Sequence, residues 1–145
     1  MTEERRAQDQ RAQDQRVIED QRVIEDFRAN GGVTEGRTLL LLHHVGAKSG
    51  VERVTPLRYL SSGDRWVVAA GNGGLPPNPG WYYNVLAQPS VVVEVGTETL
   101  EATARVAEGD EREELAQMFR NAKSRFAAFE KALKRQIPIV VFERA

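Results

Sequence analysis

The chain has 145 residues, of which 41% are hydrophobic and 28% charged, and its net charge at pH 7 is −1. This length and composition predict one globular domain with its own core and exclude a disordered or collagen-like chain. There is no cysteine and there are two histidines, which excludes a disulfide scaffold, a thiolate metal site and a cysteine nucleophile and argues against a histidine zinc site. The near-neutral net charge gives no sign of a nucleic-acid-binding surface, and apolar runs such as 39–42 are far too short to span a membrane. We therefore expect a cytoplasmic protein, with peripheral membrane association left open.

The first twenty residues consist largely of tandem repeats. Residues 6–10 recur as 11–15, and residues 15–20 recur as 21–26. Periods of five and six residues match no solenoid unit, and perfect back-to-back copies are typical of a local duplication. We therefore expect residues 1–20 to be a repetitive N-terminal extension whose composition favours a helix, and we base no functional assignment on them; residues 21–145 are expected to form the folded domain.

In chain order, hydrophobic patterning and turn residues predict alternating helices and strands. The first helix is expected to end at Asn30, where two glycines follow. Pro56 lies inside a predicted strand, which places that strand at an edge, at a bulge or against a ligand. The strands are expected at residues 37–45, 52–60, 65–71, 90–95, 98–106 and 137–143, and further helices at 80–87, from 109 onwards and at 123–135. Short strands in consecutive hairpins favour an α+β fold built on an antiparallel β-barrel with peripheral helices.

Charge is distributed unevenly along the chain. Residues 94–114 carry a net charge of −6 and residues 120–135 a net charge of +5. Such segments are commonly solvated helix faces. The alternative is that the basic segment borders a site for an anionic ligand.

Several familiar motifs are excluded by their residues. His43 and His44 are adjacent in a predicted strand, so their side chains point to opposite faces and cannot bind one metal ion together, which favours structural roles. The pair Lys48-Ser49 lacks both glycines of a Walker A loop. The run 71–74 is glycine-rich, but prolines and not a helix follow it, which excludes a dinucleotide-binding fingerprint.

The turn Gly46-Ala-Lys-Ser-Gly50, followed by Arg53, is the best candidate for an anion site. A glycine-flanked turn exposes backbone N–H groups, Lys48 brings a point charge, Ser49 a hydroxyl, and Arg53 a planar fork that suits phosphate or carboxylate oxygens. The alternative is a surface hairpin whose charges serve solubility alone.

A second candidate is the aromatic cluster of the short helix at 80–87. Trp81 and Asn84 are three residues apart and share a helix face. A flat ring could stack near Trp81 and accept or donate a hydrogen bond at Asn84. The alternative is that Trp81 packs in the core, with Tyr82 or Tyr83 facing outward.

Several of these blocks together resemble the deazaflavin-dependent nitroreductase family, which consists of actinobacterial reductases that use the reduced coenzyme F420. The blocks are Thr38-Leu-Leu-Leu-Leu42, Gly46-Ala-Lys-Ser-Gly50, Arg53, Thr55-Pro-Leu57, Ala69-Ala-Gly-Asn-Gly-Gly74, Pro79-Gly-Trp-Tyr-Tyr-Asn84 and Gln88-Pro89. The likeness spans roughly residues 21–143. It implies a split β-barrel like that of flavin-binding reductases, F420 as cofactor, a small-molecule hydride acceptor, and a monomer or homodimer.

The resemblance also implies a set of site residues. Lys48, Ser49, Gly50 and Arg53 would hold the cofactor's phosphate and glutamate tail, with help from the basic segment 120–135. The ring would be cradled by Val54, Thr55, Pro56, Leu57, Ala69, Ala70, Gly71, Asn72, Trp81, Tyr82 and Asn84. The substrate would meet Tyr83, Phe126 and Phe129.

The implied reaction is hydride transfer from reduced F420 to an activated alkene, a quinone or a nitroaromatic compound. The following proton would come from solvent or from Tyr82 or Tyr83. Ala47 stands where the family usually has arginine, so one tail contact is missing. Phenylalanine at 126 and 129 lacks the hydroxyl of a tyrosine, which weakens the expectation of a side-chain proton donor there and of nitroimidazole reduction.

Two other readings fit the same residues. A split-barrel enzyme that uses FMN would also need a phosphate clamp and a groove for a flat ring, although the +5 segment favours the longer anionic tail of F420. A non-enzymatic protein that carries a cofactor or a lipophilic molecule would bind the same ligand without oxidising it.

Overall fold

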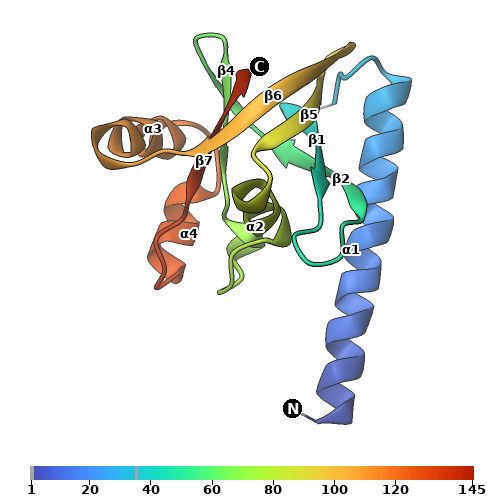
Figure 1. The fold of residues 1–145 in the computed structure, drawn as a ribbon. Helices are drawn as coiled ribbons and strands as arrows, with labels where there is room; N and C mark the ends of the chain where they lie inside the picture. The colour runs from blue at the N-terminus through green and yellow to red at the C-terminus, as the bar shows by residue number, and fades with distance from the viewer. Residues whose placement is uncertain (1, 35) are drawn as a thin grey trace.

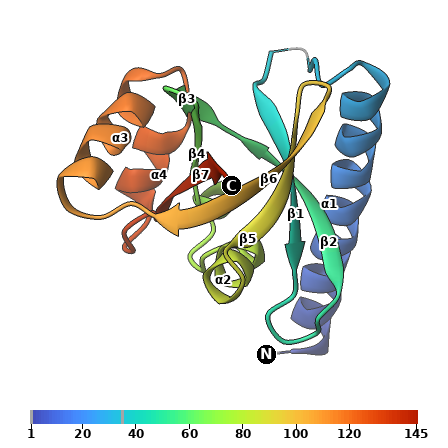
Figure 2. The same cartoon turned by 45° about the horizontal axis from the view of Figure 1, so that its top comes forward.

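The computed structural model describes residues 2–34 and 36–145. In this part of the chain, seven antiparallel strands form a sheet with the order β2-β1-β5-β6-β7-β4-β3, and helices surround it (Figures 1 and 2). The strands are β1 (Leu39–Val45), β2 (Glu52–Arg58), β3 (Leu60–Ser62), β4 (Arg65–Ala69), β5 (Ser90–Val95), β6 (Glu98–Val106) and β7 (Ile139–Arg144). The helices are α1 (Glu3–Ala29), the 3-10 turn η1 (Asn72–Gly74), α2 (Gly80–Ala87), α3 (Gly109–Asn121) and α4 (Phe126–Ala132).

The sheet curls because its two outermost strands are consecutive in the chain. β2 and β3 lie at opposite ends of the strand order, and Tyr59 alone separates them. The Tyr59 amide also donates to the Thr38 carbonyl oxygen at 3.1 Å. A chain that joins both edges of a sheet through one residue brings those edges together, so the sheet forms a split barrel. The predicted α+β split-barrel fold is confirmed.

The four leucines of β1 form a continuous apolar run because both faces of this strand are covered. Leu40 and Leu42 point into the barrel, where they join its main core. Leu39 and Leu41 point outward and pack against Ile24 and Phe27 of α1, together with Val23 and Val54. Strands covered on both faces lose the alternation of a half-exposed strand.

The strand β7 is covered in the same way on the other side of the barrel. Val140 and Phe142 face the barrel interior, whereas Ile139 and Val141 pack against the helices α3 and α4. Figure 1 shows these two helices on the side of the barrel away from α1.

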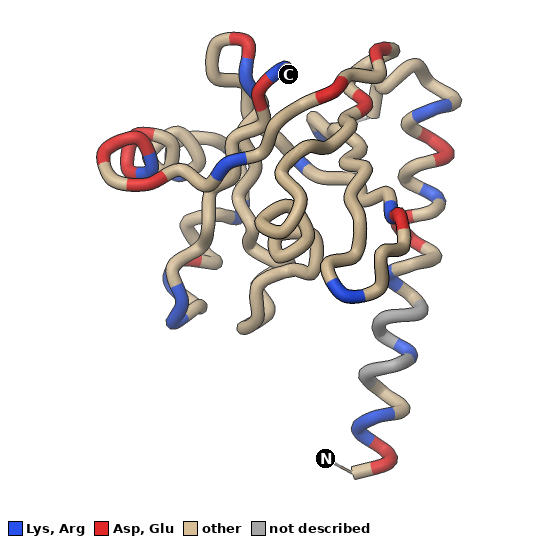
Figure 3. The backbone as a smooth tube through the Cα atoms, viewed as in Figure 1, with Lys and Arg blue, Asp and Glu red and all other residues tan. Residues whose placement is uncertain are grey.

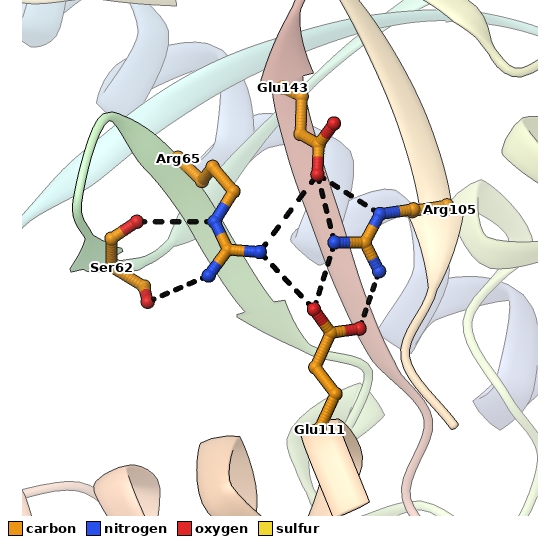
Figure 4. A network of polar contacts seen from close by, with 5 residues as sticks. All are labelled: Ser62, Arg65, Arg105, Glu111 and Glu143. Carbon is orange, nitrogen blue, oxygen red and sulfur yellow. Dashed lines mark hydrogen bonds and ion pairs between the residues drawn. The ribbon is translucent and has the colours of Figure 1, made fainter. Parts of the chain in front are cut away.

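A polar network fixes the start of α3 to the sheet (Figure 4). The guanidinium of Arg105 on β6 binds both carboxylate oxygens of Glu111 and also Glu143 on β7, at 2.8 Å. Arg65 of β4 joins Glu111 at 3.2 Å and reaches Ser62. The hydrogen bonds from Arg105, with its charge and that of Arg65, lower the pKa of Glu111 to about 2.

The helix α1 runs through the duplicated region without a break, and Figure 1 shows its N-terminal half extending past the barrel. A six-residue repeat turns by about 600° at 100° per residue, so its two copies lie about 120° apart around the helix. The second copy therefore packs while the first does not: Ile24 is 5% exposed, whereas Val17 and Ile18 are 68% and 49% exposed. The division of the chain at residue 20 stays a prediction.

Five predicted elements differ from the structure. The strands expected at 37–45 and 65–71 are shorter, as β1 (Leu39–Val45) and β4 (Arg65–Ala69). The strand expected at 52–60 is broken at Tyr59 into β2 and β3, which raises the strand count of the described residues from the expected six to seven. The helix expected at 123–135 is reduced to α4, Phe126–Ala132, because Ser124 bonds back to the Phe119 carbonyl oxygen and holds a turn there. The last strand begins at Ile139, after Pro138.

Candidate functional site

A groove of about 410 Å³ opens between β2, β4, α2 and α4. Its apolar wall consists of Pro56, Leu57, Val68, Ala69, Pro79, Trp81, Phe119, Phe126 and Phe129. Its polar lining consists of Arg16, Asp20, Thr55, Arg58, Asn72, Ser124 and Arg125, and Gly71 and Gly73 complete it. Apolar walls with a few polar groups are typical of ligand sites.

Of the predicted site residues, about half line this groove. They are Thr55, Pro56, Leu57, Ala69, Gly71, Asn72, Trp81, Phe126 and Phe129. Pro56 lies on β2, an edge strand of the sheet, and also lines the groove, as its position in a strand predicted. The residues outside the groove lining are Lys48, Ser49, Gly50, Arg53, Val54, Ala70, Tyr82, Tyr83 and Asn84.

One wall of the groove is bare backbone. Asn72, Gly73 and Gly74 all have positive φ, a conformation that glycine adopts without strain. The Phe129 ring packs so closely on this segment that a Cβ atom added at Gly71 would lie 2.9 Å from it, and one added at Gly74 3.1 Å. Glycine at these positions therefore allows α4 to approach the loop.

Arg135 holds the same loop in place. Its five N–H groups each donate a hydrogen bond to a loop oxygen, at distances of 2.7 to 3.3 Å. The acceptors are the carbonyl oxygens of Ala70, Gly71, Leu75 and Pro76 and Oδ1 of Asn78. Sequence reasoning did not find this role, because it depends on a contact across about sixty residues of chain.

The charge of the segment 120–135 is therefore partly neutralised within the protein. Arg120 binds Glu113 and Glu130, each at 2.8 Å, and Arg135 is enclosed by the loop. Figure 3 shows acidic residues gathered on α3 and basic residues in the segment around α4. The attraction of an anionic tail stays a prediction for the exposed cations of this segment, which are Lys123, Arg125, Lys131 and Lys134.

The hairpin at 46–50 is ordered by its own hydrogen bonds. The Gly46 amide donates to the Val51 carbonyl oxygen at 2.9 Å, and the Gly50 amide to the Gly46 carbonyl oxygen at 2.9 Å. Ser49 Oγ accepts from the Val51 amide at 3.2 Å, and it occupies the space that a Cβ at position 46 would need. Lys48 and Arg53 are exposed and make no ion pair within the described residues, so both charges face solvent beside the groove.

A chain of hydrogen bonds connects this hairpin to the groove. The Ala47 amide donates to Asn84 Oδ1 at 2.9 Å. Asn84 Nδ2 lies 2.9 Å from His44 Nδ1, and His44 Nε2 lies 2.8 Å from Thr55 Oγ1. Both polar atoms of the Asn84 side chain therefore already have a partner within the protein, which leaves only the second N–H of Nδ2 for the bound ring that Asn84 was expected to face.

The two histidines point to opposite faces, as their adjacency predicted. His43 points outward, where it contacts Glu94 at 2.6 Å and Glu52 at 3.3 Å. His44 points inward and is 4% exposed. Its burial, followed by the positive charges of Arg53 and His43, lowers the pKa of His44 to about 4.

The three aromatic residues of α2 have different environments. Trp81 is buried, lines the groove and lies 6.5 Å from the Phe142 ring. Tyr82 is half-buried against the barrel core. Tyr83 is 51% exposed. Neither tyrosine lines the groove, so neither hydroxyl is placed there as a proton donor.

Sequence reasoning missed several polar residues of the groove. Arg16 and Asp20 lie within the N-terminal extension, on which no functional assignment was based, and Arg16 contacts Asn72 Oδ1 at 3.3 Å. Burial raises the pKa of Asp20. Arg125 lies with its guanidinium carbon 5.5 Å from the centre of the Phe129 ring, which is a cation–π contact. The sequence did contain one signal: Arg16 and Asp20 are four residues apart, so in a helix they share one face and can reach the same site.

These features define a split-barrel protein with a largely apolar groove and an exposed cationic hairpin. A family model described as F420H(2)-dependent quinone reductase matches residues 17–144. The chain belongs to this family of F420-dependent oxidoreductases, which confirms the resemblance, the enzyme class and the cofactor predicted from the sequence.

Relatives of known name agree with this assignment. An F420H(2)-dependent quinone reductase of Mycobacterium tuberculosis is 35% identical over 109 residues, which is 72% of this chain and 72% of the relative. A second relative from the same organism, named for the same activity, is 31% identical over 114 residues, which is 79% of this chain and 96% of the relative.

Solved structures agree as well. The F420-H2 dependent reductase FDR-A is 36% identical, with a TM-score of 0.67, over 74% of this chain and 95% of that one. A chain described as a domain-swapped dimer is 34% identical, with a TM-score of 0.69, over 88% of this chain and 96% of that one. The haem storage protein HutZ from Vibrio cholerae, at 17% identity and a TM-score of 0.53, shares the fold alone.

Proposed function

We propose that this protein transfers a hydride from reduced F420 to a quinone, an activated alkene or a nitroaromatic compound held in the same groove. The observation that carries the proposal is the groove itself, which has a bare backbone wall, an aromatic cover and an exposed cationic hairpin beside it. Membership of the family favours F420 over the FMN alternative and over a carrier without activity.

The residues of the groove fit a planar ring. Gly71 and Gly73 line the groove without side chains, which lets a flat ligand approach the backbone closely. Leu57, Ala69 and Trp81 supply apolar surface, and Thr55 supplies a hydroxyl. We propose that these residues hold the deazaflavin ring.

The tail of the cofactor is proposed to lie along the hairpin. Arg53 and Thr55 are two residues apart on β2, so their side chains share a face and lie about 6.6 Å apart along the strand. An anion bound by Arg53 and Lys48 is thereby adjacent to a ring beside Thr55. The planar guanidinium suits phosphate and carboxylate oxygens.

The acceptor is proposed to enter on the side of α4, where Phe126 and Phe129 form the cover. When bound, reduced F420 supplies two electrons and one proton as a hydride, and the acceptor takes up one further proton to reach its neutral reduced product. The chain's own part is to position the two planar molecules against each other and to exclude water between them. Because the tyrosines of α2 lie outside the groove, we propose that the second proton comes from solvent at its open end.

Two measurements test this proposal. Fluorescence titration should show saturable binding of F420 that is tighter than the binding of FMN. Under anaerobic conditions, reduced F420 should then be oxidised on addition of a quinone, with an enone and a nitroaromatic compound as separate arms and omission of the acceptor as the control. Tighter binding of FMN, or binding of F420 without oxidation by any acceptor, would contradict the proposal.

The assembly and location of the protein remain predictions. A relative of known structure is described as a domain-swapped dimer, and we propose that this chain is a homodimer, which the molar mass from light scattering would test. Within the described residues, no helix is both long enough and apolar enough to cross a membrane.

A further inference from the structure

Among the residues that the structure describes, His44 is the one polar residue in the buried core, with 4% of its surface exposed. The groove and the anion hairpin lie on either side of it. Both of its ring nitrogens have partners, Asn84 at Nδ1 and Thr55 at Nε2. A buried imidazole with two defined partners has a defined tautomer.

The hairpin decides which tautomer this is. The Ala47 amide is a donor and cannot reverse its role, so the atom of Asn84 that faces it must be the acceptor Oδ1. The amide nitrogen of Asn84 therefore faces His44, and Nδ1 of His44 must accept. A neutral imidazole that accepts at Nδ1 carries its proton at Nε2, so His44 donates to Thr55 Oγ1.

This direction of donation has a consequence for the threonine. With its oxygen accepting from His44, the hydroxyl of Thr55 keeps its own proton for another acceptor, and the structure gives it none within the described residues. Thr55 lines the groove, and it shares the inward face of β2 with Leu57. The hydroxyl proton is thus available to an acceptor atom in the groove.

We propose that His44 is a positioning residue which, in its Nε2-protonated form, directs the Thr55 hydroxyl as a hydrogen-bond donor into the groove and, through Asn84, holds the anion hairpin at a fixed distance from it. The acceptor on the ligand is a carbonyl oxygen or an unprotonated ring nitrogen at the edge of the flat ring. The identity of that ligand as F420 rests on the proposed function, whereas the tautomer and its two contacts do not.

The first test observes the tautomer directly. The chain has two histidines, so nitrogen-15 NMR of the imidazoles, with His43→Gln to assign the signals, reads His44 without interference. We expect a protonated Nε2 and an unprotonated Nδ1 at pH 7. Substitution Asn84→Asp replaces the amide donor by a carboxylate, so Nδ1 should become protonated and the pKa of His44 should rise. A proton on Nδ1 in the unsubstituted protein would overturn the proposal.

The second test measures oxidised F420 by fluorescence titration. Thr55→Val removes the hydroxyl at nearly constant shape and should weaken binding by about 3- to 10-fold, the usual effect of one hydrogen bond, whereas Thr55→Ser should bind as the unsubstituted protein does. His44→Asn keeps an acceptor near Nδ1 but loses the donor to Thr55, so its effect should largely disappear when it is combined with Thr55→Val. His43→Gln, on the opposite face, is the matched control.

The outcomes separate the two proposals. Equal F420 affinity of Thr55→Val and the unsubstituted protein would overturn the positioning role while leaving the proposed function intact. Failure of the unsubstituted protein to bind F420 would overturn the proposed function and the ligand-directed half of this one, and the NMR result would still decide the contact with the hairpin. If His44→Asn does not fold, the comparison of Thr55→Val with Thr55→Ser decides the role of the hydroxyl.

Discussion

The loop at 70–78 should depend on Arg135 for most of its order. Substitution Arg135→Ala removes five hydrogen bonds from a guanidinium. The carbonyl oxygen of Ala70 has no other donor within the described residues, and it belongs to a residue that is 1% exposed. A buried carbonyl left without a partner costs roughly 1–3 kcal/mol. Water can replace the donors at the more exposed oxygens.

Together these losses should lower the free energy of unfolding by about 2–4 kcal/mol. For a chain of this length that corresponds to a fall in Tm of about 5–12 °C. Arg135→Lys keeps the charge but has three N–H donors on one atom and cannot span the loop, so its effect should be intermediate.

Calorimetry and urea unfolding measure these changes, and Lys134→Ala is the matched control, because Lys134 is exposed and adjacent in the chain. A Tm for Arg135→Ala equal to that of Lys134→Ala would refute the reasoning. F420 titration adds a second readout: affinity should fall because the backbone wall of the groove loosens, and the fall should be insensitive to salt.

Three further predictions concern the hairpin, the glycine wall and acid stability. Arg53→Ala should weaken F420 binding by about tenfold, with a smaller salt dependence than before, and an unchanged affinity would remove the hairpin from the site. Gly71→Ala should lower the free energy of unfolding by about 1–3 kcal/mol, because its Cβ would meet the Phe129 ring at 2.9 Å; combination with Phe129→Ala should recover part of the strain, and a purely additive pair would show that the clash is not its cause. As pH falls from about 6.5 to 4, the unfolded chain binds a proton at His44 that the native protein does not, so stability falls in that window. At 1.36 kcal/mol per pK unit, the difference between 6.5 and about 4 sets an upper limit of about 3 kcal/mol on this loss. Below pH 4.5 stability falls further, because the unfolded chain binds a proton at Glu111, whereas in the native protein the pKa of this carboxylate is lowered to about 2. Urea unfolding from pH 7 to 3 measures both, and His44→Asn should flatten the upper window alone.

The elements that could be predicted most accurately from the sequence are those bounded by turn residues. The helix expected at 80–87 and the strands expected at 90–95 and 98–106 have the same bounds in the structure. Proline, glycine and the Gln88-Pro89 pair mark their ends locally. The break at Tyr59 has no such mark, because it arises from the closure of the barrel, which is a property of the whole sheet.

The residues of the candidate site show the same difference between local sequence signals and long-range contacts. Residues of the groove that belong to the family's blocks, such as Thr55, Gly71 and Trp81, could be assigned from the sequence. The contacts of Asn84 with His44 join residues forty positions apart, and those of Arg135 with the loop join residues about sixty apart. Both are created by packing, and the residue types alone are equally compatible with solvent-exposed roles.

The strand β2 determines the spacing between the two parts of the proposed site, the hairpin and the groove. It carries Arg53 at the hairpin and Thr55 at the groove, and it is an edge strand held by a seven-pair antiparallel register with β1. A slip of one residue would turn Thr55 outward and bring Val54 into the barrel. The hydrogen bond between His44 and Thr55 forms in one register alone, since His44 lies opposite Arg53 and reaches diagonally to the next inward residue. The buried histidine therefore fixes the register of the strand as well as the donor that this strand presents to the groove.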